Sequence, residues 1–453
     1  MSSRWLALTL TFFAAGPIAA ETPGGYAVVV SRETFNRPDW KRVVDTLVAK
    51  HGGRVVAYDT LDDARAGLAE PMPRYACFVA TPAEATREFV AGVHRLTRKL
   101  DDDPYTDVIW GILTGHDAAN ALRIARQTEP LEIRRAVAGT EVALSACPSG
   151  IVFSETEAGK IMRKQSGHEP VTEKGPTDST KSIVDALNDG KADVFITSGH
   201  ASERNWQIGY NYRNGYFKSK AGQLFGEDTK RQQFPINSPN PKVYLAAGNC
   251  LMGHINGPDS MALAYMNSGG VHQMIGYTVD TWFGYGGWGC LDYFVEQPGR
   301  FTLAEAFYAN HQALLNVLET KFPKDAKKES GEGSRNGYLY DRDVVAFYGD
   351  PAWSVRMAPG PLAWDQELTE KDGVFTFTIT PKMSDKSFQP VNKNGSQRGG
   401  RPIFAFLPHR IKNVTVTKGG DLKPVVTDNF LMVPQPTDGS HAYRVVFKAE
   451  AGR

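Results

Sequence analysis

Two hydrophobic patterns alternate along the first part of the chain. Continuous apolar runs, typical of strands buried on both faces of a sheet, are followed by segments whose apolar residues recur at helical spacing. The first series predicts strands at 26–31, 54–60, 75–81 and 107–115, and helices at 37–53, 61–70, 82–100 and 117–127. Because strands separated by helices form parallel sheets covered on both faces, we expect a first α/β subdomain over residues 22–135.

A second series of the same kind follows over residues 136–357. It predicts strands at 140–150, 191–200, 242–250 and 271–279, and helices at 178–190, 259–270 and 303–322. An aromatic and polar insertion over residues 201–241 interrupts the series. In open parallel sheets, ligands and chemistry collect outside the carboxyl ends of the strands, and His200 and Cys250 both lie at such ends.

The pattern changes after residue 357. Apolar and polar residues alternate between turn-rich stretches at 374–382, 402–411, 413–418 and 442–450. This alternation predicts a small antiparallel sandwich over residues 358–453. The expected fold class is therefore α/β, with parallel sheets flanked by helices in two subdomains, followed by a small all-β, immunoglobulin-like domain.

Residues 1–20 carry a different signal. Arg4 precedes an apolar run from Trp5 to Ala15, and small residues stand at Ala19 and Ala20. This arrangement is typical of a secretory signal peptide cleaved after Ala20, and the apolar run is too short to span a bilayer. We expect a secreted or periplasmic protein without a membrane span.

Composition and charge narrow the class of partner. The 453 residues are 41% apolar, which is ample for the cores of two or three domains. Lys and Arg (51) balance Asp and Glu (50), so the net charge of +1 indicates neither a nucleic-acid nor an anionic-membrane partner. We expect a protein or peptide substrate, and the oligomeric state stays open.

The four cysteines show no C-x-x-C spacing. They are Cys77, Cys147, Cys250 and Cys290, which is too few for a disulfide scaffold, and no zinc ribbon is indicated. If Cys250 is a free thiol, the other three form either one disulfide and one buried thiol or three buried thiols. The spacing does not choose between these arrangements.

His200 and Cys250 together indicate nucleophilic catalysis. Each follows an apolar strand, and Cys250 comes 250 − 200 = 50 residues after His200. A cysteine nucleophile needs a base within hydrogen-bond reach, and neighbouring parallel strands bring such tips together. Small residues flank both positions and leave room for a substrate backbone. The backbone N–H groups of Ala201 and Cys250 are then candidates for an oxyanion site.

The surroundings of both residues resemble the gingipain family of caspase-like cysteine peptidases. That family has Gly-His-Gly-Ser-Glu followed by Trp, and this chain matches it at Gly199, His200, Ser202, Glu203 and Trp206. The segments 107–126, 278–282 and 347–356 and the cysteine region are also similar to the family. The resemblance covers about residues 25–357 and implies His200 as general base and acid, Cys250 as nucleophile, and Trp282 as one wall of the pocket for the residue before the scissile bond.

Two positions depart from the family pattern. Ala201 stands where the family has glycine, and a positive φ would be costly for alanine. The family also has a glutamate that orients the histidine at the end of an earlier strand, where this chain reads "LSACPSG". Glu141, Glu155 and Glu157 lie near that segment, and the third member stays open among them, or is absent.

The family includes enzymes selective for Arg or Lys, in which an acidic residue binds the substrate cation. Glu155, Glu157 and Glu203 are available for this role, and Glu203 is the candidate that lies within the histidine motif. The resemblance therefore implies a preference for a basic residue before the scissile bond.

Two metal interpretations are weaker. His254 and His272 lack the helical spacing and intervening glutamate of a zinc site, so we expect supporting or core roles for them. The run 101–103 of aspartates lacks the full ligand series of a calcium loop and indicates a solvated loop. We expect an exported cysteine endopeptidase without cofactor or catalytic metal; the alternative is a catalytically inactive exported protein of the same scaffold that serves in binding or assembly.

Overall fold

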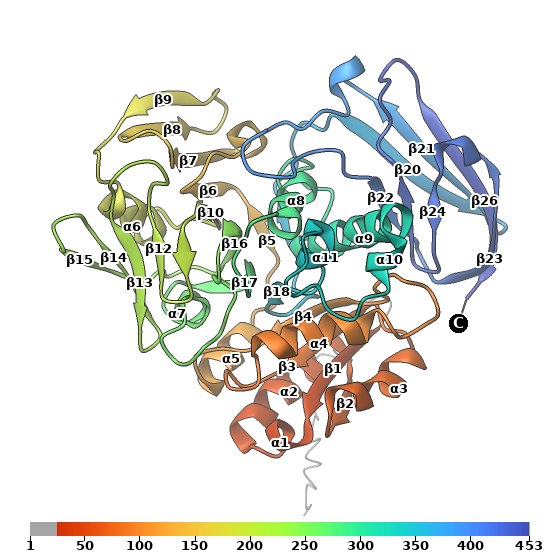
Figure 1. The fold of residues 1–453 in the computed structure, drawn as a ribbon, viewed down its shortest axis with the longest axis horizontal. Helices are drawn as coiled ribbons and strands as arrows, with labels where there is room; N and C mark the ends of the chain where they lie inside the picture. The colour runs from red at the N-terminus through yellow and green to blue at the C-terminus, as the bar shows by residue number, and fades with distance from the viewer. Residues whose placement is uncertain (1–24, 453) are drawn as a thin grey trace, which may run out of the picture.

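The computed structural model describes residues 25–452, and the predicted signal peptide, residues 1–20, lies outside them. One twelve-stranded sheet runs through the body of the molecule (Figure 1). Its strands, in spatial order, are β2 (Arg54–Tyr58), β1 (Tyr26–Ser31), β3 (Tyr75–Val79), β4 (Ile109–Leu113), β18 (Val345–Tyr348), β17 (Val271–Tyr277), β16 (Lys242–Asn249), β10 (Val194–Gly199), β6 (Arg135–Ala138), β7 (Ser149–Phe153), β8 (Lys160–Lys164) and β9 (Val171–Lys174).

The two predicted α/β series share this sheet. Strands β2, β1, β3 and β4 pair in parallel, and β4 continues into β18 at the pair Ile112 and Tyr348. Strand β18 is antiparallel to β17, after which β17, β16, β10, β6 and β7 are again parallel. Strands β8 and β9 form an antiparallel edge. The predicted α/β class with a helix-flanked, mainly parallel sheet is confirmed.

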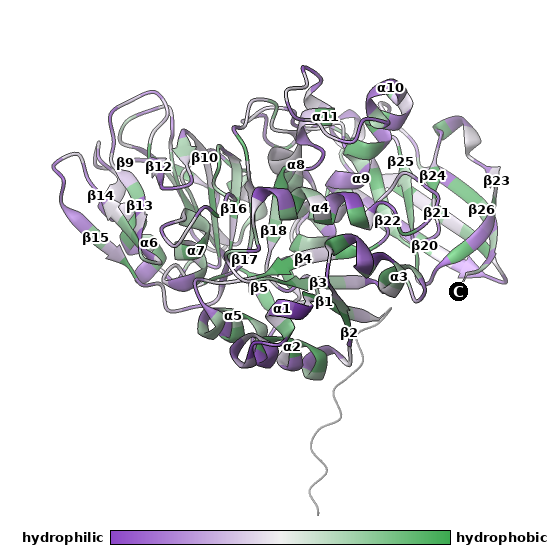
Figure 2. Ribbon diagram, turned by 60° about the horizontal axis from the view of Figure 1, so that its bottom comes forward, coloured by the Kyte–Doolittle hydropathy of each residue, from purple (hydrophilic) through white to green (hydrophobic). Residues whose placement is uncertain are grey.

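Helices cover both faces of the sheet (Figure 2). They are α1 (Arg32–Phe35), α2 (Pro38–His51), α3 (Ala64–Ala69), α4 (Arg87–Thr97), α5 (Ala118–Ala125), α6 (Thr180–Asn188), α7 (Met261–Asn267), α8 (Tyr285–Phe294), α9 (Leu303–Lys321), α10 (Pro323–Ala326) and α11 (Gly337–Asp341). Helix α2 ends at Gly52 in the left-handed region (φ 62°), the glycine stop that the sequence indicates. In residues 25–452, no helix is long and apolar enough to cross a membrane.

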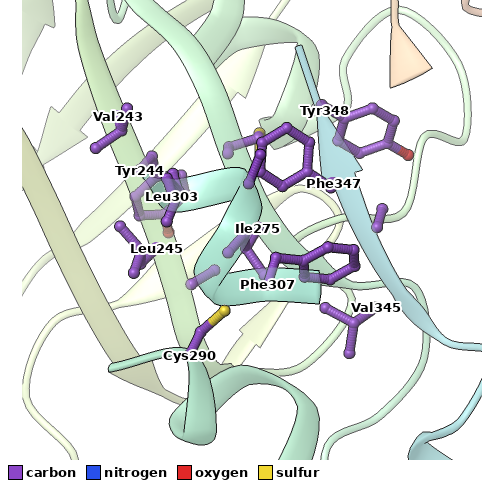
Figure 3. Close-up of a cluster of buried hydrophobic side chains, with 14 of the residues drawn as sticks. Val243, Tyr244, Leu245, Ile275, Cys290, Leu303, Phe307, Val345, Phe347 and Tyr348 are labelled. Carbon is purple, nitrogen blue, oxygen red and sulfur yellow. The ribbon is translucent and has the colours of Figure 1, made fainter. Parts of the chain in front are cut away.

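A cluster of apolar side chains lies beneath the central strands (Figure 3). Strands β16, β17 and β18 pack against α8 and α9 with side chains that are almost completely buried: Val243, Tyr244, Leu245, Ile275, Cys290, Leu303, Phe307, Val345, Phe347 and Tyr348. Strands buried on both faces read as continuous apolar runs, which is why the sequence predicts β16 and β17. Packing in this core fixes the position of β16, the strand that precedes Cys250.

The predicted strand at 140–150 is wrong. Strand β6 ends at Ala138 and β7 begins at Ser149, and between them Leu144–Ala146 form one turn of 3-10 helix. The apolar side chains of this segment are buried although the segment is a loop. A short apolar run can be buried equally well in a loop and in a strand, so the pattern alone does not distinguish the two. As a consequence Glu155 lies just past the end of a strand, β7.

The insertion after His200 forms a separate antiparallel sheet that the sequence analysis did not identify. Its strands are β11 (Ala201–Ser202), β12 (Asn205–Gln207), β13 (Tyr216–Lys220), β14 (Gln223–Glu227) and β15 (Gln233–Ile236). Trp206 is buried beneath it and donates its indole N–H to the carbonyl of Ser198 at 2.8 Å. The insertion thereby braces the end of β10.

The predicted carboxyl-terminal β-domain is present. One sheet contains β20 (Trp364–Lys371), β21 (Val374–Pro381), β26 (Tyr443–Ala451) and β23 (Ile411–Lys418), and the other contains β22 (Ile403–Phe406), β25 (Phe430–Val433) and β24 (Val425–Val426). All their pairings are antiparallel, and the domain has an apolar core of its own. A short parallel pair, β5 (Leu131–Ile133) and β19 (Val355–Met357), lies outside these sheets.

Candidate active site

Strand register brings His200 and Cys250 to the same edge of the sheet. Strands β10 and β16 are parallel, and Gly199 pairs with Asn249, so the next residues, His200 and Cys250, follow side by side. The pairing skips Ala247, which forms a bulge in β16. A bulge shifts the register by one residue, and without this one Gly199 would pair with Gly248, so that His200 would lie opposite Asn249 instead of Cys250.

The side chain of Asn249 ties the two strand ends together. It is buried, donates from Nδ2 to the carbonyl oxygen of Gly199 at 3.1 Å, and accepts at Oδ1 from the hydroxyl of Thr197 at 2.6 Å. Sequence reasoning missed this residue. Its only signal is a polar side chain at the end of an apolar strand, directly before the cysteine.

Cys250 is partly exposed, and the loop after β17 holds it. The backbone N–H of Thr281 donates to Cys250 Sγ at 3.2 Å, and the Thr281 hydroxyl donates to the carbonyl of Asn249 at 3.1 Å. The next residue, Leu251, adopts φ 56°, which is costly for a side chain larger than glycine. Strained backbone of this kind clusters at functional sites, and here it turns the chain sharply after the cysteine.

The imidazole of His200 is exposed. It stacks on the ring of Tyr210 with centroids 4.7 Å apart and planes inclined by 20°. Within residues 25–452, no hydrogen bond joins either ring nitrogen to another protein atom, including Cys250 Sγ. Catalytic hydrogen bonds are often long without substrate and tighten in the complex, so this geometry is compatible with a base.

Of the three candidate glutamates, Glu155 lies beside the end of β10. Its buried carboxylate accepts hydrogen bonds from the hydroxyl of Thr140 (2.6 Å), the amide of Asn394 (3.1 Å) and the hydroxyl of Ser198. A Cβ placed on Gly199 would lie 3.8 Å from Glu155 Oε2. All three donors are neutral, and none belongs to His200.

The other two glutamates lie elsewhere. Glu157 pairs with Lys160 on the neighbouring edge strand. Glu141 contributes its backbone carbonyl to Asn394 at 3.1 Å, whereas its side chain makes no hydrogen bond in the part of the chain that the structure describes. Of the three, Glu155 is therefore the carboxylate that the fold brings to the end of β10.

Trp282 directly follows the residue that contacts Cys250. Its indole is 52% exposed and packs against Tyr340 and Phe283, with ring centroids 5.4 Å and 5.7 Å away. An exposed tryptophan anchored on one side only offers its other face to a ligand. The position suits a wall beside Cys250.

Glu203 and Ala201 both belong to the hairpin that follows His200. The carboxylate of Glu203 lies 4.0 Å from the guanidinium of Arg204, and its carbonyl accepts from the first backbone N–H of α7, that of Met261, at 2.8 Å. Ala201 pairs with Trp206 and does not adopt a positive φ, so alanine carries no backbone strain there.

The small residues before Cys250 pack closely against their neighbours. Ala246 and Ala247 are buried, and a Cβ added at Gly248 would approach the indole nitrogen of Trp288 to 2.6 Å. The indole of Trp288 in helix α8 therefore occupies the space beside Gly248, and the expectation that small residues around His200 and Cys250 leave room for a substrate backbone stays a prediction.

No protein-family model and no curated protein matches the chain. Two solved structures do. The chain is similar to gingipain R. The crystal structure of that Arg specific cysteine proteinase shares 13% sequence identity with this chain at a TM-score of 0.48, over 96% of this chain and 100% of gingipain R.

The second match is the complex of the Porphyromonas gingivalis RgpB pro- and mature domains. It shares 13% identity at a TM-score of 0.47, over 92% of this chain and 94% of the other. At this identity the likeness to gingipain R concerns the fold and not the residues of a site.

The remaining thiols, Cys77, Cys147 and Cys290, are buried. All four cysteines are free, so the arrangement with three buried thiols is the one present. Burial raises the pKa of Cys147 to about 12 and raises the pKa of Cys77 and Cys290 above the ordinary range for a thiol. Figure 3 shows Cys290 inside the core.

The histidines considered for metal binding do not gather. Arg123 hydrogen-bonds the ring of His272 at 2.8 Å, and burial, reinforced by this cation, lowers the pKa of His272 to about 3. Among the described residues, one group offers three close metal ligands: Asp101, Asp103 and Asp107, whose oxygens lie within 4.8 Å of one another. Asp102, in the middle of the expected solvated loop, is exposed and outside this group.

Proposed function

We propose that this chain is an exported cysteine endopeptidase in which Cys250 and His200 hydrolyse peptide bonds. The observation that carries the proposal is the register of β10 and β16, which aligns the ends of the two strands directly before His200 and Cys250. The clamp by Asn249 and the turn at Leu251 support it, because a nucleophile and its base need fixed positions.

The chemistry follows from these two side chains. His200 takes the Cys250 thiol proton as the sulfur attacks the substrate carbonyl, and it returns that proton to the leaving amine as the C–N bond breaks. Water, deprotonated by His200, then hydrolyses the thioester and releases the acid and the thiol. The backbone N–H groups of Ala201 and Cys250 are the proposed donors to the oxyanion.

For the substrate we propose a basic side chain before the scissile bond, with Trp282 as a wall of its pocket. Glu155 supports this preference, because its carboxylate lies beside Gly199 and no cationic side chain among residues 25–452 forms an ion pair with it. Glu203 remains a second acidic candidate, although Arg204 lies 4.0 Å from it.

A covalent probe tests the proposal. A library of peptide acyloxymethyl ketones, followed by mass spectrometry, should label Cys250 in the wild-type protein, and His200→Ala should abolish the labelling. Cys250→Ala should abolish peptide hydrolysis with nearly unchanged Tm, whereas Cys147→Ala should keep it. An unlabelled, inactive but folded wild-type protein would reject the peptidase and leave the binding or assembly role.

Glu155 has its own test. Glu155→Gln should reduce kcat/KM for peptides with Arg or Lys before the scissile bond by about 100-fold, as expected when a charge-paired contact is lost, and should spare neutral peptides. Glu203→Gln is the matched control for the second acidic candidate. An equal loss on all peptides in Glu155→Gln would instead assign Glu155 to the catalytic group itself.

A further inference from the structure

One loop of the β-domain crosses to the strand ends of the α/β body. Residues 389–401, here called the crossing loop, precede β22, and Figure 1 shows this part of the chain extending from the β-domain over α8 toward β7. At its tip, Asn394 Nδ2 donates to Glu155 Oε1 (3.1 Å), to the hydroxyl of Thr140 (3.0 Å) and to the carbonyl of Glu141 (3.1 Å). A side chain from the β-domain is thus one of the three hydrogen-bond donors to the Glu155 carboxylate.

Buried charges anchor the crossing loop on helix α8. The Arg398 guanidinium, only 4% exposed, donates to Asp292 at 2.7 Å and also binds Glu296. The carboxylate of Glu296 further accepts from the backbone N–H groups of Val391 (2.9 Å) and Asn392 (3.1 Å). Buried, multiply bonded pairs of this kind fix geometry, because breaking one leaves an uncompensated charge.

The crossing loop also contacts the cysteine side of the site. Gly395 adopts φ 93°, and a Cβ there would come within 2.3 Å of the Trp288 ring, which also lies against Gly248 of β16. The Ser396 hydroxyl donates to the carbonyl of Phe283 at 2.8 Å, one residue after Trp282. The crossing loop therefore contacts both the Glu155 carboxylate, through Asn394, and the residue next to Trp282, through Ser396.

We propose that Asn394 is a positioning residue for Glu155, so that the β-domain is a working part of the active site. This inference rests on the proposed peptidase function. The amide fixes one carboxylate oxygen by a neutral hydrogen bond, which orients the group without cancelling the charge offered to a substrate cation. A site assembled from two domains loses its selectivity when the crossing loop is displaced.

The experiment compares Asn394→Ala, Asn394→Asp and a matched control in the full-length protein. The control is Asn429→Ala, since Asn429 of the same domain also donates across to the α/β body, to the carbonyl of Asp107 and the hydroxyl of Tyr308, both at 3.0 Å. Peptides with Arg, Lys or a neutral residue before the scissile bond are the substrates, and Tm is measured for each variant.

We expect Asn394→Ala to lower kcat/KM for Arg and Lys peptides about tenfold while neutral peptides and the Asn429→Ala variant change little. Asn394→Asp places a second carboxylate where the amide donor was. Two carboxylates at this distance cannot both ionise without cost, so activity relative to wild type should be lowest at alkaline pH and rise as acidification supplies a shared proton.

Two results overturn the inference while leaving the peptidase standing: an active wild type with unchanged Asn394→Ala, or equal losses on every substrate in Asn394→Ala and Asn429→Ala. The second result would mean that Asn394 only docks the domains. A wild type that neither hydrolyses peptides nor reacts at Cys250 rejects the proposed function and the inference with it.

Discussion

At the residue scale, Cys250 differs from the other three thiols in exposure. It is partly exposed and accepts a hydrogen bond from the backbone N–H of Thr281, whereas Cys77, Cys147 and Cys290 are buried. A thiol reacts as its thiolate, and burial disfavours the charged form, as the pKa of about 12 for Cys147 illustrates. The exposure of Cys250 and the raised pKa of the three buried thiols therefore both favour reaction at Cys250.

Iodoacetamide should accordingly modify Cys250 in the native protein and leave the other three thiols untouched until denaturant is added. Mass spectrometry of tryptic peptides after timed quenching measures the four rates. In Cys250→Ser the native protein should take up no label. Native modification of Cys147 or Cys290 at the rate of Cys250 would contradict the selectivity.

Asn249 acts at the same scale by joining the two strand ends. Asn249→Ala leaves the Gly199 carbonyl without its donor, which should cost about 1–3 kcal/mol of stability and lower kcat/KM by about tenfold or more, because His200 follows Gly199 directly. Asn267→Ala is the control, since Asn267 makes a similar bond to the Gly222 carbonyl at 2.9 Å on another side of the molecule. Loss of Tm without loss of activity in Asn249→Ala would show that the clamp serves stability alone.

At the scale of elements, the ends of β10 and β16 depend on what packs around them. The Ala247 bulge sets the register, the hairpin after His200 braces β10 through Trp206, and α8 places Trp288 against Gly248. Glycine is needed at 248 because the indole nitrogen would stand 2.6 Å from a Cβ, closer than packed atoms approach.

Gly248→Ala should therefore displace α8 or the end of β16 and destabilise the protein by about 1–3 kcal/mol, the usual cost of overpacking. Adding Trp288→Leu should restore part of this stability by opening space, although Trp288→Leu alone is destabilising through its cavity. Urea unfolding of the two single variants and the double variant measures the coupling. Additive losses would mean that Gly248 and Trp288 are not in contact.

At the scale of the whole molecule, buried ionisable groups connect distant parts of one continuous sheet. Lys50 binds Asp350 at 2.9 Å, and Arg123 hydrogen-bonds His272 at 2.8 Å, so each pair joins a residue of the first α/β series to a residue of the second. The apolar interior that surrounds them keeps His272 neutral, with its pKa lowered to about 3. Protonation of His272 at low pH should therefore weaken the packing between the first and the second α/β series.

The sign of the pH effect follows from this shift. Because the pKa of His272 is lower in the folded than in the unfolded chain, the unfolded chain binds the extra proton between about pH 6.5 and about pH 3, and stability falls as the pH falls through this window. His272 contributes on the order of 3 kcal/mol of this loss at about pH 4.

Urea unfolding between about pH 7 and about pH 4 measures this loss, with the window set by the ordinary and lowered pKa of histidine. In His272→Gln the dependence on pH should be weaker, whereas His168→Gln, at an exposed histidine, should keep the wild-type slope. An unchanged slope in His272→Gln would show that the ring takes up its proton as readily in the folded protein as in the unfolded chain.

The sequence by itself determined the strands and helices of the first series, the central strands β10, β16 and β17, the β-domain and the placement of His200 and Cys250 at strand ends, because local periodicity and turn residues encode these features. It misassigned 140–150, where a short apolar run is equally buried as a loop. Only the tertiary structure decided that Glu155, and not Glu141 or Glu157, stands at the strand ends, and that Asn394, 239 positions away along the chain, bonds to it. Such contacts depend on the packing of whole domains, and no local pattern in the sequence encodes them.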